Sequence, residues 1–266
     1  MIPKIIHYCW FGHGLMPQSQ KSYIQHWSEL MPDWEFKKWD ESNFDINFCP
    51  YTSEAYARKK YAFVSDVARL YALVNFGGIY LDTDVELFGS LEPYIHHKAF
   101  SGIEIYHDDY ENNALPLLEK DGAPKIENAI IPCCGLLTAL MGSEAHNLYF
   151  QDCLNAYIHR PSVNEDGEFN AIIINHLMAP IAVKYGFRYK DVFQQLPDMT
   201  VYPSNVFAFD PDSKTADSVA YHHMAWSWNK KTKKEKIHIL LDKLGLTRKN
   251  IRRIYETFFK RNNKQT

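Results

Sequence analysis

Two aspartates one residue apart, Asp82 and Asp84, directly follow the apolar segment 79–81. Two carboxylates this close repel each other unless a cation lies between them. Hard divalent ions such as Mg²⁺ and Mn²⁺ take oxygen ligands and keep room for phosphate oxygens. The pair therefore predicts a site for a metal and a diphosphate. A solvated acidic turn is the alternative that the spacing alone leaves open.

A second charged pair precedes this loop. Asp66 and Arg69 are three residues apart in a segment with helical apolar spacing, so they share one face of the expected helix. A surface ion pair that contributes little stability is the plain interpretation. The same helix continues through Gly77-Gly78 into the acidic loop, and we therefore expect its start to approach the same site.

The elements that must position these side chains begin as a βαβ unit. A strand at Lys4–Trp10 ends in a glycine loop, and a helix at Ser19–Leu30 and a strand at Trp34–Trp39 follow it. A long helix is expected over Ser53–Phe76, with the glycine pair as its C-terminal cap. The short strand 79–81 then carries the aspartates at its carboxyl end, where open α/β sheets bind ligands. Later apolar segments, expected to be strand and helix elements, are 128–140 and 171–183.

Composition limits the class of protein. A chain of 266 residues with 46% hydrophobic side chains suits one large domain or a domain with an appendage. The five cysteines are odd in number and lack metal-ligand spacing, which favours reduced thiols in a cytoplasmic protein. The N-terminal apolar stretch is too short for a signal peptide, and no apolar run is long enough to predict a transmembrane helix.

The net charge of −3 hides an uneven distribution. Residues 229–266 hold 13 Lys and Arg against three acidic residues, so the preceding part of the chain is strongly acidic. The segment 236–259 is amphipathic and predicts one helix, or two helices broken at Gly245. A basic amphipathic helix favours contact with an anionic membrane surface, and a solvated helix packed on the domain is the alternative. The acidic body argues against nucleic acid as a partner.

The segment SDVARLYALVNFGGIYLDTDVE resembles the DXD-containing glycosyltransferases of family 32, which include yeast-type initiating mannosyltransferases, capsule-sugar transferases and, more distantly, glucosylating toxins. The family pattern is S-D-x-x-R, about seven residues, then G-G-x-Y-x-D-x-D. The matching positions are Ser65, Asp66, Arg69, Gly77, Gly78, Tyr80, Asp82 and Asp84. The resemblance implies an α/β fold of the GT-A type, a Rossmann-like nucleotide-sugar-binding domain over residues 1–230, with a basic helical tail at 231–266.

Two further segments carry the resemblance to the nucleotide side of the site. The first strand is similar to the family strand in which a tryptophan stacks on the nucleobase, which implies that Trp10 is the base platform and that the Cys9 backbone contacts the base edge. Glu127-Asn128-Ala129-Ile130 is similar to a segment that lines the donor-sugar site, which implies that Asn128 hydrogen-bonds sugar hydroxyls.

The segment YHHMAWSW resembles the family block that closes over the diphosphate. Neutral imidazole is a competent Mn²⁺ ligand, and adjacent histidines point in different directions, so we expect one of His222 and His223 to bind metal and favour His223. The resemblance implies that Ser227 and the Trp228 indole donate hydrogen bonds to the β-phosphate.

The resemblance implies a retaining transferase that moves a hexose from a nucleotide-sugar to a glycan or polyprenyl-linked saccharide, with Mn²⁺ or Mg²⁺, in surface polysaccharide synthesis at the inner face of the membrane. A UDP-sugar is favoured because tryptophan stacking suits a pyrimidine. Asp66, Arg69, Asp82 and Asp84 are the expected catalytic set, the two aspartates of the loop also being metal ligands, and no nucleophile is assigned.

Three questions stay open on the sequence. Glu104, Asp108 and Asp109 are candidates for the acceptor side, and nothing in the pattern chooses among them. Asp82-Thr83-Asp84-Val85 also fits the first motif of a haloacid-dehalogenase-type phosphatase, in which the first aspartate accepts a phosphoryl group. A non-catalytic carbohydrate-binding protein on a transferase fold is the third interpretation.

Overall fold

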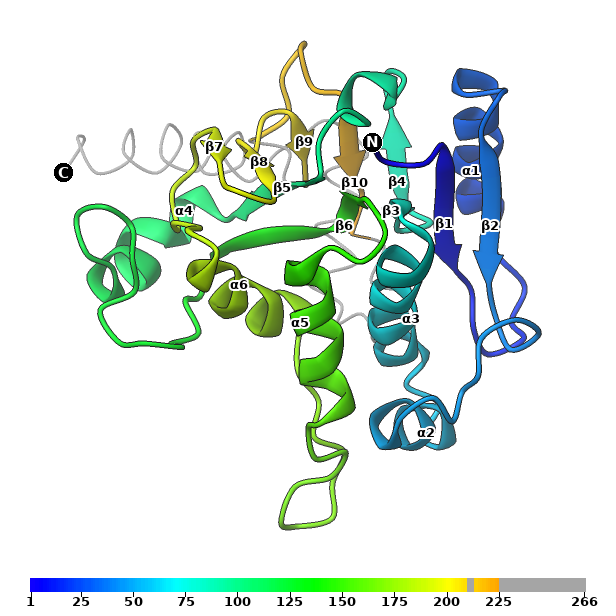
Figure 1. The fold of residues 1–266 in the computed structure, drawn as a ribbon, viewed down its shortest axis with the longest axis horizontal. Helices are drawn as coiled ribbons and strands as arrows, with labels where there is room; N and C mark the ends of the chain where they lie inside the picture. The colour runs from blue at the N-terminus through cyan, green and yellow to red at the C-terminus, as the bar shows by residue number, and fades with distance from the viewer. Residues whose placement is uncertain (210–212, 225–266) are drawn as a thin grey trace, which may run out of the picture.

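The computed structural model describes residues 1–209 and 213–224. Its order of elements follows the expected opening, a strand, a helix and a strand, and two helices and two strands come next (Figure 1). The helices are α1 (Gln18–Leu30), α2 (Pro50–Ala57), α3 (Tyr61–Phe76), α4 (His107–Asp109), α5 (Leu148–Ile158) and α6 (Ile174–Lys184), with short 3-10 or π turns at Glu92–Tyr94, Tyr110–Ala114 and Leu115–Leu117. The strands are β1 (Ile5–Cys9), β2 (Glu35–Trp39), β3 (Gly78–Leu81), β4 (Val85–Leu87), β5 (Ala99–Ile105), β6 (Cys134–Ser143), β7 (Gln194–Gln195), β8 (Thr200–Tyr202), β9 (Phe207–Ala208) and β10 (Ala220–His222).

The main sheet has seven strands in the order β2-β1-β3-β6-β5-β8-β7. Strand β1 pairs parallel with both β2 and β3, which is the Rossmann-like opening that the sequence predicts. Strand β6 runs antiparallel to both β3 and β5, so the sheet is mixed beyond that point. Every residue of β6 is buried, which suits its central position. The expected α/β fold is confirmed.

A second sheet of three strands, β4-β10-β9, lies beside the main one. Strand β4 follows the aspartate loop directly, and β10 pairs antiparallel with it although the two are more than 130 residues apart in the chain. This small sheet is therefore what brings the distant residues 220–222 to the aspartates (Figure 1).

Two hydrophobic cores lie on opposite faces of the main sheet. One holds residues of α2, α3, α5 and α6, such as Leu70 and Met178, packed against sheet residues such as Ile103. The other holds residues of α1 and the small sheet, among them Trp27 and Leu87. The Trp27 indole donates a hydrogen bond to the Val85 carbonyl at 3.0 Å, which ties α1 to the strand that follows the aspartates.

The expected single helix over Ser53–Phe76 is two helices in the structure. Helix α2 ends at Ala57, and Lys59 adopts a left-handed backbone with φ of 58°. The Lys60 amide donates to the Ala55 carbonyl at 2.8 Å, a bond that closes a helix C-terminus of the Schellman type. The apolar spacing continues across this turn because both helices pack on the same core, so periodicity alone does not show the break.

The glycine pair at the junction of α3 and β3 has a steric cause as well as a capping role. Gly77 and Gly78 both have positive φ, 65° and 104°. A Cβ on Gly78 would lie 2.7 Å from the Ile5 carbonyl oxygen and 2.9 Å from His7 Nε2. His7 itself is buried, with Nε2 2.7 Å from the Gly77 carbonyl and Nδ1 accepting from the Trp39 indole at 3.1 Å. The turn from α3 into β3 is thus held against β1 by backbone contact.

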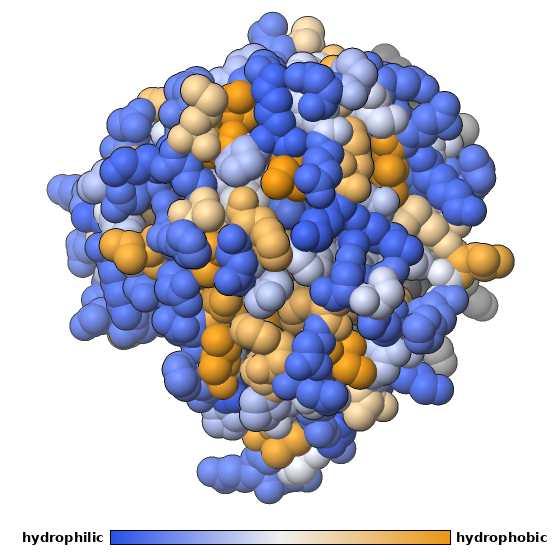
Figure 2. Space-filling model, turned by 45° about the vertical axis from the view of Figure 1, so that its right-hand side comes forward, coloured by the Kyte–Doolittle hydropathy of each residue, from blue (hydrophilic) through white to orange (hydrophobic). Residues whose placement is uncertain are grey.

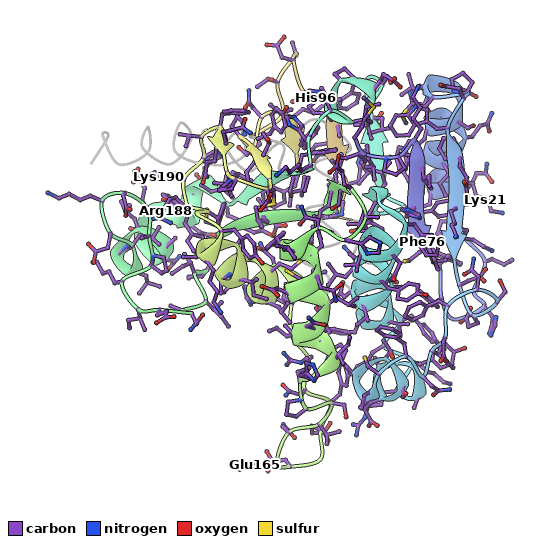
Figure 3. All side chains as sticks on the ribbon, viewed as in Figure 1. Lys21, Phe76, His96, Glu165, Arg188 and Lys190 are labelled. Carbon is purple, nitrogen blue, oxygen red and sulfur yellow. The ribbon has the colours of Figure 1, made fainter. Side chains whose placement is uncertain are left out.

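The face drawn in Figure 2 is hydrophilic over most of its area, and apolar side chains gather near its centre and lower half. Charged side chains such as Lys21 on α1 and Glu165 in the loop between α5 and α6 point outward (Figure 3). Among the described residues, no helix has the length and apolar character needed to cross a membrane. The expected helical tail at 231–266 lies outside the described residues, and so does the domain boundary at 230.

Candidate metal and diphosphate site

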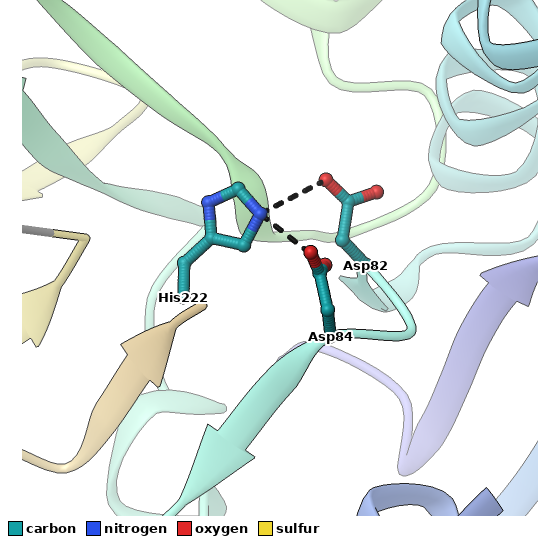
Figure 4. Close-up of side chains that lie close together, drawn as sticks. All are labelled: Asp82, Asp84 and His222. Carbon is teal, nitrogen blue, oxygen red and sulfur yellow. Dashed lines mark ion pairs between the residues drawn. The ribbon is translucent and has the colours of Figure 1, made fainter. Parts of the chain in front are cut away.

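Three potential metal ligands converge at the junction of the two sheets (Figure 4). Asp82 follows β3, Asp84 precedes β4, and His222 ends β10. His222 Nε2 lies 3.2 Å from Asp84 Oδ1 and 3.9 Å from Asp82 Oδ2, and one ligand atom from each residue falls within 4.8 Å of the other two. Strand register brings His222 close to the aspartates, because β10 pairs with β4 so that His222 lies opposite Val85, the residue after Asp84.

The electrostatics of this group suit a cation. Burial alone would lower the pKa of His222, but the carboxylates of Asp84, Asp82 and Glu104 together raise it to about 9. The three acidic groups thus stabilise a positive charge at this position, which the protonated imidazole of His222 supplies. Two carboxylate oxygens and an imidazole nitrogen form a donor set suited to a divalent ion such as Mn²⁺. His222 Nδ1 is buried and has no hydrogen-bond partner among the described residues.

Asp82 is oriented from the helix side of the site. Arg69 Nη2 lies 3.3 Å from Asp82 Oδ1 and 3.0 Å from Asp66 Oδ1, and the Tyr80 hydroxyl donates to Asp82 Oδ1 at 2.7 Å. Arg69 also donates to the Thr138 carbonyl at 2.9 Å, and its guanidinium stacks over the Tyr80 ring. Asp66 and Arg69, which the sequence places on one helix face, are therefore a buried pair rather than a surface one.

The buried pair carries perturbed pKa values. Burial raises the pKa of Asp66 to about 7, although the Arg69 charge acts against this shift. Burial alone would lower the pKa of Arg69, but Asp82, Tyr80 and Asp66 raise it above its ordinary value. Groups with such shifts, set next to a candidate metal site, are typical of functional sites.

The structure places His222, and not His223, beside the aspartates. His223 Nε2 lies 2.9 Å from Glu86 Oε2, and its ring stacks on Tyr23. Its backbone amide donates to the Asp84 carbonyl at 3.1 Å, so the chain at this point still follows β4. Successive side chains of an extended chain point to opposite sides. The preference for His223 as the metal ligand therefore differs from this geometry, which favours its neighbour.

The residues expected at the nucleobase lie at the carboxyl end of β1. Cys9 is buried with its Sγ 4.0 Å from the Ser65 carbonyl, and burial raises the pKa of its thiol to about 12. The Trp10 side chain is half-buried, and its indole donates to the Gly14 carbonyl at 2.6 Å. Ser65 donates its hydroxyl to the Tyr61 carbonyl within α3, so what it presents to Cys9 and Arg69 is its own carbonyl.

The remaining expected residues divide into three groups. Asn128 is exposed, with φ of 58°, in the segment between β5 and β6, and no contact joins it to the aspartates. Asp108 and Asp109 are exposed on α4. Ser227 and Trp228 lie outside the described residues.

One polar group at the site was left unassigned by sequence reasoning. Glu104 on β5 lies within electrostatic reach of His222, and burial raises its pKa to about 7, although His222 and a hydrogen bond from Asn175 act in the opposite direction. The signal that could have singled it out is its alternation with Ile103 and Ile105, which places a carboxylate on one face of a strand whose other face is core.

Comparison with known proteins agrees with the resemblance. Residues 17–101 match the model of the family described as "Glycosyltransferase sugar-binding region containing DXD motif". A stretch of 106 residues is 37% identical to inositol phosphoceramide mannosyltransferase 3 of Schizosaccharomyces pombe. This stretch is 37% of the present chain and 29% of the relative, so the chain spans less than a third of that protein's length. The resemblance to DXD-containing glycosyltransferases is confirmed.

Two solved structures are similar in part. The PaToxG glycosyltransferase matches with a TM-score of 0.47 and 16% identity, over 69% of each chain. The galactosyltransferase LgtC, solved with donor and acceptor sugar analogues, matches with a TM-score of 0.45 and 11% identity, over 82% of this chain and 86% of that one.

Proposed function

Because residues 17–101 carry the DXD-containing sugar-binding region of glycosyltransferases, we propose that this chain is a metal-dependent glycosyltransferase. It transfers a hexose from a nucleotide-sugar, with a UDP-sugar favoured, to a saccharide hydroxyl. The product keeps the anomeric configuration of the donor. The acceptor is a glycan or a lipid-linked saccharide in the synthesis of surface polysaccharide.

The observation that carries this proposal is the convergence of Asp82, Asp84 and His222 next to Arg69. A divalent ion bound to the first three would act as a Lewis acid toward the departing nucleoside diphosphate. Arg69 is buried, charged and already aligned by Asp66 and Asp82, so it can stabilise negative charge without reorganising. The site thus places a group of metal ligands next to a fixed arginine.

The other roles follow from position along the same edge. Trp10 and the Cys9 backbone, at the end of β1, bind the nucleobase, and Tyr80 and Ser65 support the donor through Asp82 and Arg69. Asp66 accepts hydrogen bonds from donor-sugar hydroxyls. Asn128 reaches the sugar only if the segment between β5 and β6 approaches it, and Ser227 and Trp228 contact the β-phosphate from the segment that follows β10.

The acceptor and the location rest on the chain's charge distribution. The basic segment 229–266 would attract the protein to an anionic membrane surface, where a polyprenyl-linked saccharide is available. The strongly acidic body of the chain argues against nucleic acid as a partner. The protein would then act in the cytoplasm, at the inner face of the membrane.

The test is a screen of nucleotide-sugars for Mn²⁺-dependent release of nucleoside diphosphate, including UDP-glucose, UDP-galactose, UDP-N-acetylhexosamines and GDP-mannose. Asp84→Ala should reduce activity by about a hundredfold or more, as expected on loss of a metal ligand. Asp217→Ala is the matched control, because Asp217 is an exposed aspartate that does not belong to the group of potential metal ligands.

Three results would contradict the proposal. Activity unchanged in Asp84→Ala would remove the metal site. Metal-dependent hydrolysis of p-nitrophenyl phosphate, without action on any nucleotide-sugar, would favour the phosphatase. Failure to bind any nucleoside diphosphate with Mn²⁺ by calorimetry would favour a non-catalytic carbohydrate-binding protein.

A further inference from the structure

Glu104 on β5 is an acidic side chain near the metal group that has no role in the proposed function. It is partly exposed, so a ligand can reach it, and it lies within electrostatic reach of His222 and Asp82. In the described part of the chain no lysine or arginine contributes to its environment. His222 is the cationic group near it, but no ion pair among the described residues includes Glu104. A carboxylate partly withdrawn from water without a direct ion pair destabilises the fold, so its presence calls for a reason beyond packing.

A buried amide lies next to the Glu104 carboxylate. Glu104 stands opposite Gly135 in the antiparallel pair of β5 and β6, and side chains of such partners lie on the same face. A Cβ on Gly135 would lie 2.1 Å from Asn175 Oδ1, so the Asn175 amide occupies the place next to Glu104 that a Gly135 side chain would take. Helix α6 brings Asn175 there by packing on β6 (Figure 1).

The orientation of the Asn175 amide is determined by the hydrogen bond that its oxygen accepts. Asn175 is buried, and its Oδ1 accepts the Leu136 backbone N–H at 2.9 Å. Its amide nitrogen is then the group available to donate to Glu104, and this amide acts to lower the Glu104 pKa. The Asn175 amide can thus serve one lone pair of the carboxylate inside the protein, which leaves the others for a ligand.

The chemistry of that ligand follows by exclusion. Glu104 is not a member of the metal group, whose ligand atoms in the described residues come from Asp82, Asp84 and His222. A carboxylate repels a diphosphate. Arg69, on the helix side of Asp82, is already the group that can stabilise the negative charge of the diphosphate. A neutral group that donates hydrogen bonds fits best, and hydroxyls are the groups that a saccharide offers in number.

We propose that Glu104 accepts a hydrogen bond from a hydroxyl of the saccharide acceptor, and that Asn175 is the positioning residue that holds its carboxylate toward the metal group. The inference rests on the proposed function, because it takes Asp82, Asp84 and His222 as the site of the donor's diphosphate. It also chooses Glu104 over Asp108, which lies four residues further along, exposed on α4.

The experiment separates donor from acceptor. Wild type and Glu104→Gln are compared in hydrolysis of the active nucleotide-sugar, with water as the acceptor, and in transfer to methyl α-glucoside, methyl α-galactoside and methyl α-mannoside. Hydrolysis and the donor KM should stay within about twofold. The acceptor KM should rise about tenfold or more, as expected when a hydrogen bond to a charged group is lost. Asp108→Asn is the matched control and should change neither reaction.

The outcomes are distinguishable. Equal loss of hydrolysis and transfer in Glu104→Gln would place Glu104 at the donor sugar, and weaker Mn²⁺ binding by calorimetry would make it a metal ligand or a support of His222; either result overturns the inference. A wild type that hydrolyses the donor but transfers to none of the three hexosides also contradicts it. A wild type that neither binds nor hydrolyses any nucleotide-sugar instead overturns the proposed function.

The positioning role has its own readout. Asn175→Ala and Gly135→Ala should both raise the acceptor KM while hydrolysis is kept, because the first removes the donor to Glu104 and the second displaces it. Thermal unfolding of both variants checks that they fold. A fall in hydrolysis that matches the fall in transfer would show a structural role only.

Discussion

The two sides of the candidate metal site are built in different ways. The side formed by α3, β3 and the start of β4 comes from one continuous segment, and its charged groups hold one another through Arg69. The side formed by β10 reaches the same point from more than 130 residues away, through pairing with β4. The first side is specified by local spacing. The second depends on strand register, so a shift of one residue would exchange His222 for His223.

The largest effect is expected on the continuous side, for Arg69→Met. The change leaves Asp66 and Asp82 without their shared cation in a buried place, and loss of one partner of a buried pair costs about 3–5 kcal/mol. The free energy of unfolding from urea titration measures it. Arg58→Met is the control, since its pair with Glu54 is partly exposed and should matter by less than about 1 kcal/mol. Similar values for the two variants would mean that the buried network does not support this side.

Gly78→Ala tests whether the turn into β3 is determined by backbone contact. A methyl group there meets the Ile5 carbonyl oxygen at a positive φ, and we expect a loss of about 2–3 kcal/mol in the free energy of unfolding. Gly89→Ala should be nearly neutral, because nothing lies within 4 Å of a Cβ at that position. A neutral Gly78→Ala would contradict the close approach of β1 to this turn.

The β10 side is tested by the two adjacent histidines. His222→Ala should weaken Mn²⁺ binding by about ten- to a hundredfold, because it removes one of three ligands. His223→Ala should leave Mn²⁺ affinity within about threefold, because its imidazole faces Glu86 and Tyr23. Calorimetric titration of the metal-free proteins measures both. The reverse order of effects would show that the strand register in solution differs from the one described.

The smallest effect concerns pH, and two histidines should respond with opposite sign. Burial lowers the pKa of His7 to about 4, so its contribution to stability is present above its unfolded pKa and is lost as pH falls from about 6.5 toward 4. At pH 5.5 we expect a loss of about 1 kcal/mol relative to pH 7.5. His222 has a raised pKa, so in metal-free protein its contribution is present below about 6.5 and is lost as pH rises toward 9.

Nitrogen NMR of the imidazoles in metal-free protein distinguishes the two. His7 should remain neutral at pH 5.5, and His222 should remain protonated at pH 7.5. Mn²⁺ affinity should rise with pH over the range in which His222 loses its proton, because proton and metal compete for Nε2. A neutral His222 at pH 7.5 would mean that the aspartates do not approach it as closely as described.

Much of the continuous side could be predicted from the sequence. Asp66 and Arg69 follow helical spacing, and Gly77-Gly78 mark the end of that helix. The aspartates follow the next strand, so the sequence separation predicts which of these residues are neighbours. The break between α2 and α3 could not be predicted in this way, because both helices pack on one core and the apolar spacing continues across Lys59.

The sequence by itself determined the residue types at the site, the α/β opening and the acidic loop, because these depend on spacing within about 25 residues, where helix and strand periods still predict direction. Only the tertiary structure decided which histidine faces the aspartates, that Arg69 is buried between two carboxylates, and that Glu104 has Asn175 beside it. Those depend on the pairing of β10 with β4 and of β5 with β6, and strand register between distant segments is set by packing of the whole domain.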